Sequence, residues 1–196
     1  PEPSLAGYSG GMPTLPRADV SVLAAYASPR ETRQMDHFTR MCLSSACAAL
    51  EEAGISPGET ENTGPVLASG YGPAAPSFAF LDSILDYGFK MASPLSFSHS
   101  VQNIPIAGMA LRLGIQGPRL TVCQFETSVA AALLSASVWL AEGRVSRVLF
   151  GAADELTPVL PDVAAKIVEA EGGSGQGRRR RYPLGEGAAF FVLGLE

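Results

Sequence analysis

The residues best placed to do chemistry lie in one short stretch, from Leu120 to Ala130. It opens with apolar, partly β-branched residues, which are typical of a buried strand, and runs into the small and apolar segment 129–141, which predicts a buried helix ending at Gly143. A strand that passes directly into a helix makes a sharp elbow, where a side chain faces unpaired N–H groups and the positive end of the helix dipole. Enzymes use this geometry to hold and activate a nucleophile. The sequence places Glu126 at the elbow and Cys123 earlier, inside the predicted strand.

Other reactive side chains are scattered. His99 stands beside Phe97 in a predicted loop, 91–101, and is interpreted as a hydrogen-bonding residue rather than an acid–base group. Cys42 and Cys47 fit small core positions of a helix. The chain has three cysteines, an odd number inside apolar segments, which predicts buried free thiols in a reducing compartment. No Cys/His spacing resembles a zinc site, so we expect neither a metal nor a cofactor.

Composition excludes some functions. The 196 residues suffice for one domain, with 46% hydrophobic residues and a mean hydropathy of +0.17. No apolar run is long enough to span a bilayer, so we expect a buried core plus an apolar surface covered by a partner, and no membrane. A net charge of −5 argues against nucleic acid. The Pro/Gly-rich N-terminus lacks a secretory signal, which favours a cytoplasmic location.

The elements that must position the elbow alternate between strands and helices, which predicts an α/β fold whose apolar strands are buried on both faces of a layered sheet. Residues 1–30 are expected to form an N-terminal arm on the surface, with a strand or short helix at 20–26. Residues 172–181 are rich in glycine and end in arginines, which predicts a loop. The predicted strands are 64–70, 120–125, 146–152 and 187–194, and the predicted helices are 31–53, 77–87, 103–113, 129–141 and 162–170.

Four motifs in order resemble β-ketoacyl synthases. The segment 112–122 resembles the approach to that family's active-site cysteine, and 184–189 looks like its LGEGA segment. The segment 151–155 looks like its GGAE-type strand end, and 36–54 is similar to its early helix. The resemblance implies a thiolase-like fold, with a layered mixed sheet flanked by helices, of which residues 31–196 form the N-terminal half.

The departures from that family carry the functional expectation. Aligned without gaps, the family's cysteine falls on Glu126. Its catalytic histidines belong to the C-terminal half, which we expect to be absent, and His37 and His99 do not match them. A carboxylate is a weak nucleophile, and it would lie where an oxyanion hole must hold a developing negative charge. We therefore expect no condensation. Glu126 is interpreted either as a structural carboxylate at a helix start or as a group that fills the vacated site, fixes the elbow or bonds across a dimer interface.

The resemblance is strongest to chain-length factors of type II polyketide and aryl-polyene systems. It implies a non-catalytic subunit that pairs with an intact β-ketoacyl synthase as a heterodimer, shapes its acyl tunnel and product length, and works with acyl carrier protein, directly or through the partner. Arg178 to Arg181 would dock an acidic carrier or partner, or form a solvated loop. The predicted dimer interface is Leu120, Thr121, Val122, Cys123, Gln124 and Phe125. The predicted tunnel residues, which ordinary core packing would also explain, are Phe78, Phe80, Leu81, Ile84, Phe89, Met91 and Phe97.

Two other functions stay open. One is a malonyl-carrier-protein decarboxylase or acyl hydrolase that uses Glu126. The other is a fragment with no role of its own.

Overall fold

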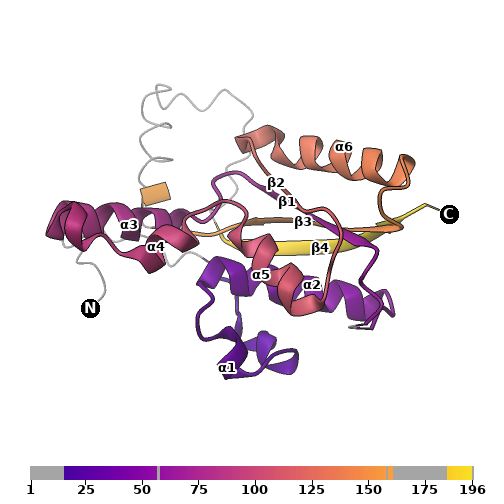
Figure 1. The fold of residues 1–196 in the computed structure, drawn as a ribbon, viewed down its shortest axis with the longest axis horizontal. Helices are drawn as coiled ribbons and strands as arrows, with labels where there is room; N and C mark the ends of the chain where they lie inside the picture. Colours follow the sequence, from indigo (N-terminus) through magenta and orange to yellow (C-terminus); the bar gives the residue numbers. More distant parts are fainter. Residues whose placement is uncertain (1–15, 57, 158, 161–184, 196) are drawn as a thin grey trace.

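A four-stranded mixed sheet forms the centre of the chain. The computed structural model describes residues 16–56, 58–157, 159–160 and 185–195. The sheet has the order β2-β1-β3-β4 (Figure 1). The α/β prediction, a layered mixed sheet flanked by helices, is confirmed. The strand β1 (Thr63–Ser69) is parallel to β2 (Leu120–Cys123) and to β3 (Arg147–Asp154), and β4 (Gly187–Gly194) is antiparallel to β3.

Burial falls from the centre of the sheet to its edges. Every residue of β1 is buried, whereas the residues of β2 are only partly buried and β4 alternates between exposed and less exposed positions. The expectation of strands buried on both faces therefore holds for β1 but not for the two edge strands. Register brings the ends of the parallel strands together, with Ser69 opposite Cys123.

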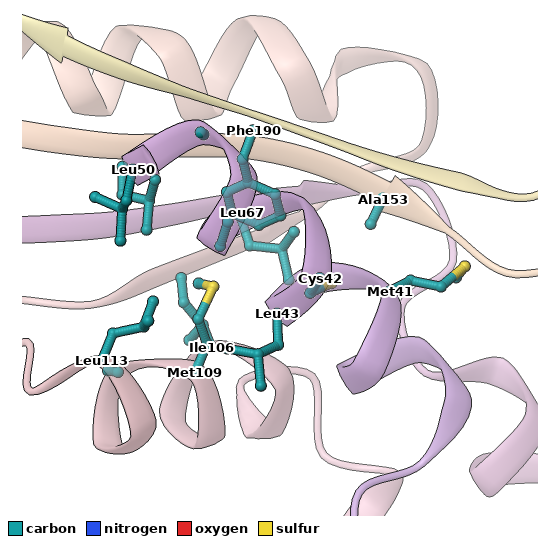
Figure 2. Packing of buried hydrophobic residues seen from close by; sticks show 14 of the residues in the cluster. Met41, Cys42, Leu43, Leu50, Leu67, Ile106, Met109, Leu113, Ala153 and Phe190 are labelled. Carbon is teal, nitrogen blue, oxygen red and sulfur yellow. The ribbon is translucent and has the colours of Figure 1, made fainter. Parts of the chain in front are cut away.

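Helices α2 (His37–Glu52) and α5 (Ile104–Leu113) cover one face of the sheet. Figure 2 shows Leu43, Leu67, Ile106 and Met109 packed between the two helices and the sheet. Gly114 ends α5 in the left-handed conformation, with φ 69°, as the predicted stop at this position requires.

The prediction of one helix over 31–53 is wrong, because the chain makes two. A short helix, α1 (Pro29–Thr32), has its own capping box between Ser28 and Glu31. The longer α2 begins after its N-cap residue Asp36, whose Oδ1 accepts a hydrogen bond from the Thr39 N–H at 2.6 Å. An aspartate at this position favours a new helix start over continuation of the old helix.

Helix α6 (Ser128–Ala141) lies on the opposite face of the sheet. Its small residues Ala132 and Ala136 pack against Val66 and Phe150. The helix was predicted to be buried, but only this stripe is, and outward residues such as Leu134 are exposed. Small side chains bring the helix close to the sheet, and Leu140 is buried with them, while the larger outward residues Leu133, Leu134 and Val138 are exposed in the described part of the chain.

A separate pair of helices lies beyond the end of the sheet. We call residues 74–99 the α3–α4 arm, which comprises α3 (Ala74–Tyr87), η2 (Phe89–Met91) and α4 (Pro94–His99). Figure 1 shows α3 and α4 together, away from the layers around the sheet. The loop predicted over 91–101 is wrong, because α4 forms there, capped by Ser93, whose Oγ accepts from the Ser96 N–H at 3.2 Å.

The described part of the predicted N-terminal arm packs on α2. The segment expected to be a strand or short helix is a 3₁₀ helix, η1 (Ser21–Ala25), and Leu23 and Ala27 join the core on the α2 face. The predicted helix 162–170 and the arginines at 178–181 lie outside the described residues. Among the residues that are described, none of the helices combines the length and apolarity that a membrane crossing needs.

Candidate functional site

The predicted elbow is present between β2 and α6. The strand ends at Cys123, a 3₁₀ turn η3 (Phe125–Thr127) follows, and α6 begins at Ser128. Phe125 has a φ of 50°, the one positive value among the non-glycine residues of the described segments. A non-glycine residue in this conformation costs about 1–3 kcal/mol and persists only where its surroundings hold it. The elbow is therefore a strained turn that neighbouring contacts must fix.

Ser128 supplies those contacts. Its side chain is buried, and its Oγ accepts a hydrogen bond from the Gln124 N–H at 2.8 Å. The same Oγ lies 2.7 Å from the Ser69 carbonyl oxygen, to which it can donate, and 2.8 Å from that of Phe125. Ser128 thus ties the elbow to the end of β1. Sequence reasoning missed this residue, although a small polar side chain at the first position of an apolar helix was a usable signal.

Glu126 lies in the elbow turn, where the alignment placed it. Its side chain is exposed, and its carboxylate makes no hydrogen bond or ion pair with the described residues. Within this part of the chain it neither caps α6 nor fixes the turn, because Ser128 does the latter. The carboxylate is therefore available to a second molecule.

Cys123 does not take over the elbow position. Its Sγ lies 3.4 Å from the Gly70 carbonyl oxygen, to which the thiol donates at the end of β1. Burial raises the pKa of the Cys123 thiol, and the nearby Asp154 carboxylate raises it further. Since the thiolate is the nucleophilic form, both effects work against a catalytic role for this sulfur.

The turn after β1 lies against the elbow. Asp154, at the end of β3, accepts hydrogen bonds from the Ser69 hydroxyl at 2.7 Å and from the N–H groups of Gly70 and Tyr71 at 3.0 Å. The Tyr71 ring meets the Phe125 ring edge to face, with centroids 5.7 Å apart. Both rings are largely exposed, so the elbow presents an aromatic pair on its surface.

A second group of carboxylates lies at the same end of the sheet. Glu155 is 4% exposed and accepts a hydrogen bond from the Ala75 N–H at 2.8 Å, and burial raises the pKa of its carboxyl to about 7. Glu186 Oε1 lies 2.7 Å from His37 Nε2, and its carboxylate also accepts from the N–H groups of Ala18 and Leu156. Burial opposes ionisation of Glu186, but these hydrogen bonds hold its pKa below the ordinary value. No cluster of three or more possible metal ligands occurs in the described ranges.

The predicted interface and tunnel residues lie on two separate surfaces. The strand β2 is at the edge of the sheet, so one side of its backbone is unpaired within the described residues. The predicted tunnel residues lie on the α3–α4 arm, where the Phe80 and Phe97 rings contact each other in a tilted arrangement, with centroids 5.2 Å apart. None of them belongs to either core cluster, and Phe89 is 85% exposed, so core packing does not explain this set.

Comparisons with known proteins agree on the family. The family model for the N-terminal domain of β-ketoacyl synthases matches residues 17–193. A chloroplastic 3-oxoacyl-[acyl-carrier-protein] synthase I from Hordeum vulgare is 24% identical over 104 residues, which cover 50% of this chain and 22% of that protein.

The similar solved structures have the same fold. The ishigamide ketosynthase/chain length factor is 25% identical with a TM-score of 0.66, covering 85% of this chain and 46% of that one. The ketosynthase ApeO in complex with its chain length factor ApeC, from Xenorhabdus doucetiae, is 15% identical with a TM-score of 0.65, covering 87% and 62%. A β-ketoacyl synthase from Burkholderia phymatum STM815 is 21% identical with a TM-score of 0.69, covering 88% and 45%. This chain thus spans roughly half the length of these proteins and less of the plant enzyme.

The family match covers β1, β2 and the elbow, and all of the edge strand β4 except its last residue. The chain belongs to the β-ketoacyl synthase family, in the part that forms the N-terminal domain of those proteins.

Proposed function

We propose that this protein is a non-condensing ketosynthase-like subunit that pairs with an active β-ketoacyl synthase and shapes the acyl tunnel of that partner. The observation that carries the proposal is the exposed Glu126 carboxylate at the elbow, the position where the family resemblance places the cysteine. Condensation needs a thiolate that can take up an acyl group as a thioester. An acyl group on a carboxylate would be a labile anhydride, and the nearby thiol of Cys123 is engaged with Gly70.

Two surfaces support the pairing. The unpaired edge of β2 can add a strand from a partner, which is how an exposed strand edge is commonly covered. The α3–α4 arm carries large exposed apolar side chains, and such patches mark sites that another protein or an acyl chain covers. The similarity to a ketosynthase/chain length factor at 25% identity supports the same kind of assembly. The acyl carrier protein would then deliver substrate to the pair.

Co-expression with an intact ketosynthase from the same organism tests the proposal. We expect the two proteins to co-purify in a fixed ratio, and the products of the ketosynthase to change in chain length when this protein is present. Glu126→Gln is the matched variant, because it keeps the size and shape of the elbow side chain. It should leave pairing and the absence of condensation unchanged.

The same variant separates the alternative. A decarboxylase or hydrolase that uses Glu126 would turn over a malonyl- or acyl-carrier protein without a partner, and Glu126→Gln would abolish that turnover. Such a result would overturn the proposal. In the described residues no acid or base pairs with the Glu126 carboxylate, so no specific contact favours this function.

A further inference from the structure

The α3–α4 arm is fastened to the body of the protein at both ends. At its start, the Glu155 carboxylate accepts a hydrogen bond from the Ala75 N–H, in the first turn of α3, at 2.8 Å. At its end, His99 Nδ1 lies 3.6 Å from Asp36 Oδ2, at the N-cap of α2. Ala74 is the one buried residue of α3, and α4 has none. The two polar contacts therefore hold an arm that has little apolar packing against the body of the protein.

The first contact is unusual because its acceptor, Glu155, is a buried carboxyl group. The residue is 4% exposed, and the first turn of α3 covers it. A glutamine in this place could accept the same hydrogen bond without a buried charge. Charged and titratable groups surround it on several elements: Asp36, His37 and Cys42 on or beside α2, Asp154 on β3, and Glu186 ahead of β4.

The balance of these neighbours disfavours ionisation. Burial is the largest cause that raises the pKa of Glu155 to about 7, and the carboxylates of Asp36 and Glu186 add to it, while the Ala75 N–H and His37 oppose it. A group that binds its proton more tightly in the covered state than in water favours the covered state when it is protonated. Ionisation of Glu155 therefore favours lifting of α3 away from the end of β3, which would admit water to the carboxylate.

The second contact holds the other end of the arm. Asp36 Oδ2 is buried and has no hydrogen-bond partner among the described residues, and His99 Nδ1 lies 3.6 Å from it.

We propose that Glu155 is a proton-sensitive latch that positions the α3–α4 arm, closed when its carboxyl group is protonated and loosened when it ionises, while the His99–Asp36 contact holds the other end of the arm. What the arm contacts rests on the proposed function, but the latch itself does not. If the arm lines a partner's tunnel, the latch would make the fit of that tunnel depend on pH. Glu155 and His99 are positioning residues, because neither needs to touch an acyl group.

Amide hydrogen exchange on the protein without a partner tests the latch. After correction for the intrinsic effect of pH on exchange, opening of the first turns of α3 should increase about tenfold between about pH 6 and pH 8, as expected for a group with a pKa of about 7 when covered and of 4.5 in water. For α2 and β1, the free energy of opening should stay the same relative to the free energy of global unfolding across this pH range.

Two variants locate the effect. Glu155→Gln keeps the acceptor for the Ala75 N–H and should remove most of the pH dependence, leaving α3 protected at pH 8 as it is in the unaltered protein at pH 6. Glu52→Gln, on the exposed end of α2, is the matched control and should leave the pH profile unchanged.

Exchange of α3 in the unaltered protein that does not depend on pH, or protection that rises with pH, would overturn the latch whether or not a variant folds. A Glu155→Gln protein with the original pH profile would also overturn it. Because this experiment uses no partner, its result is independent of the co-purification experiment. Either proposal can therefore be contradicted while the other is supported.

Discussion

Helices α5 and α3 have similar apolar sequences and opposite surroundings. In α5, Ile106, Met109 and Ala110 are completely or almost completely buried against α2 and the sheet (Figure 2). In α3, which is also rich in apolar residues, only Ala74 is buried, and Leu85 is 81% exposed. The first helix belongs to the core of the chain. The second is apolar but has no core to pack against, which supports the proposal that another molecule covers it.

The largest difference should appear in stability. Leu43→Ala, in α2, removes a side chain that is 0% exposed and should lower the free energy of unfolding by about 2–5 kcal/mol. Leu85→Ala, in α3, should change it by less than about 0.5 kcal/mol. Urea unfolding of both variants measures the contrast. A similar loss in the two variants would show that the arm belongs to the folding core.

The next effect concerns pH. Because the pKa of Glu155 is raised on folding, to about 7, its favourable contribution is fully present below the unfolded value of 4.5 and is lost as the pH rises through about 7. Glu155→Gln should abolish that loss, on the order of 2–3 kcal/mol between about pH 5 and pH 8. Unfolding curves across this range test it. Equal slopes of stability against pH in both proteins would contradict the expected role of this carboxyl group.

Loss of the Ser128 hydroxyl at the elbow should have a moderate effect on the stability of the protein. Ser128→Ala leaves the Gln124 N–H without its acceptor and breaks the link to the Ser69 carbonyl, which should cost about 1–3 kcal/mol. Ser137→Ala, in the exposed part of α6, removes only a bond to the Leu133 carbonyl and should cost much less. Thermal unfolding compares them. If the two variants unfold alike, Ser128 does not hold the elbow.

The smallest effect on stability should accompany a large effect on binding. Phe89→Ser, in η2, removes an exposed ring and should leave the free energy of unfolding within about 0.5 kcal/mol of its original value. If a partner covers the arm, the same change should weaken the complex by about 1 kcal/mol or more. Calorimetric titration of the partner measures the second quantity. Unchanged affinity would place the partner on another surface.

The strands and the fold class were predictable because their signals are local. Apolar runs such as Val66 to Ala68 and stops such as Gly114 act on their own neighbourhoods. The start of α2 at Asp36 and the helix α4 after Ser93 were missed, although each has a capping residue that the sequence displays.

The rest of the site depends on contacts between distant residues. Asp154 holds a turn 85 positions away through Ser69, and Ser128 reaches the Ser69 carbonyl across 59 positions. Sequence patterns within a single element do not predict which distant residues will form such pairs. Helical periodicity also shows which side of α3 or α6 is apolar, but not whether anything covers it. For α6 the expectation of a buried helix was wrong, and for α3 the alternative of ordinary core packing does not hold.

Intact-mass spectrometry of the co-purified complex, after incubation with an acyl-loaded carrier protein, tests the central claim most directly. The account predicts that the acyl group is found on the partner ketosynthase and never on this protein, whose elbow carries Glu126 where the family resemblance places a cysteine. An acyl adduct on this protein, at Cys123 or at Glu126, would contradict it.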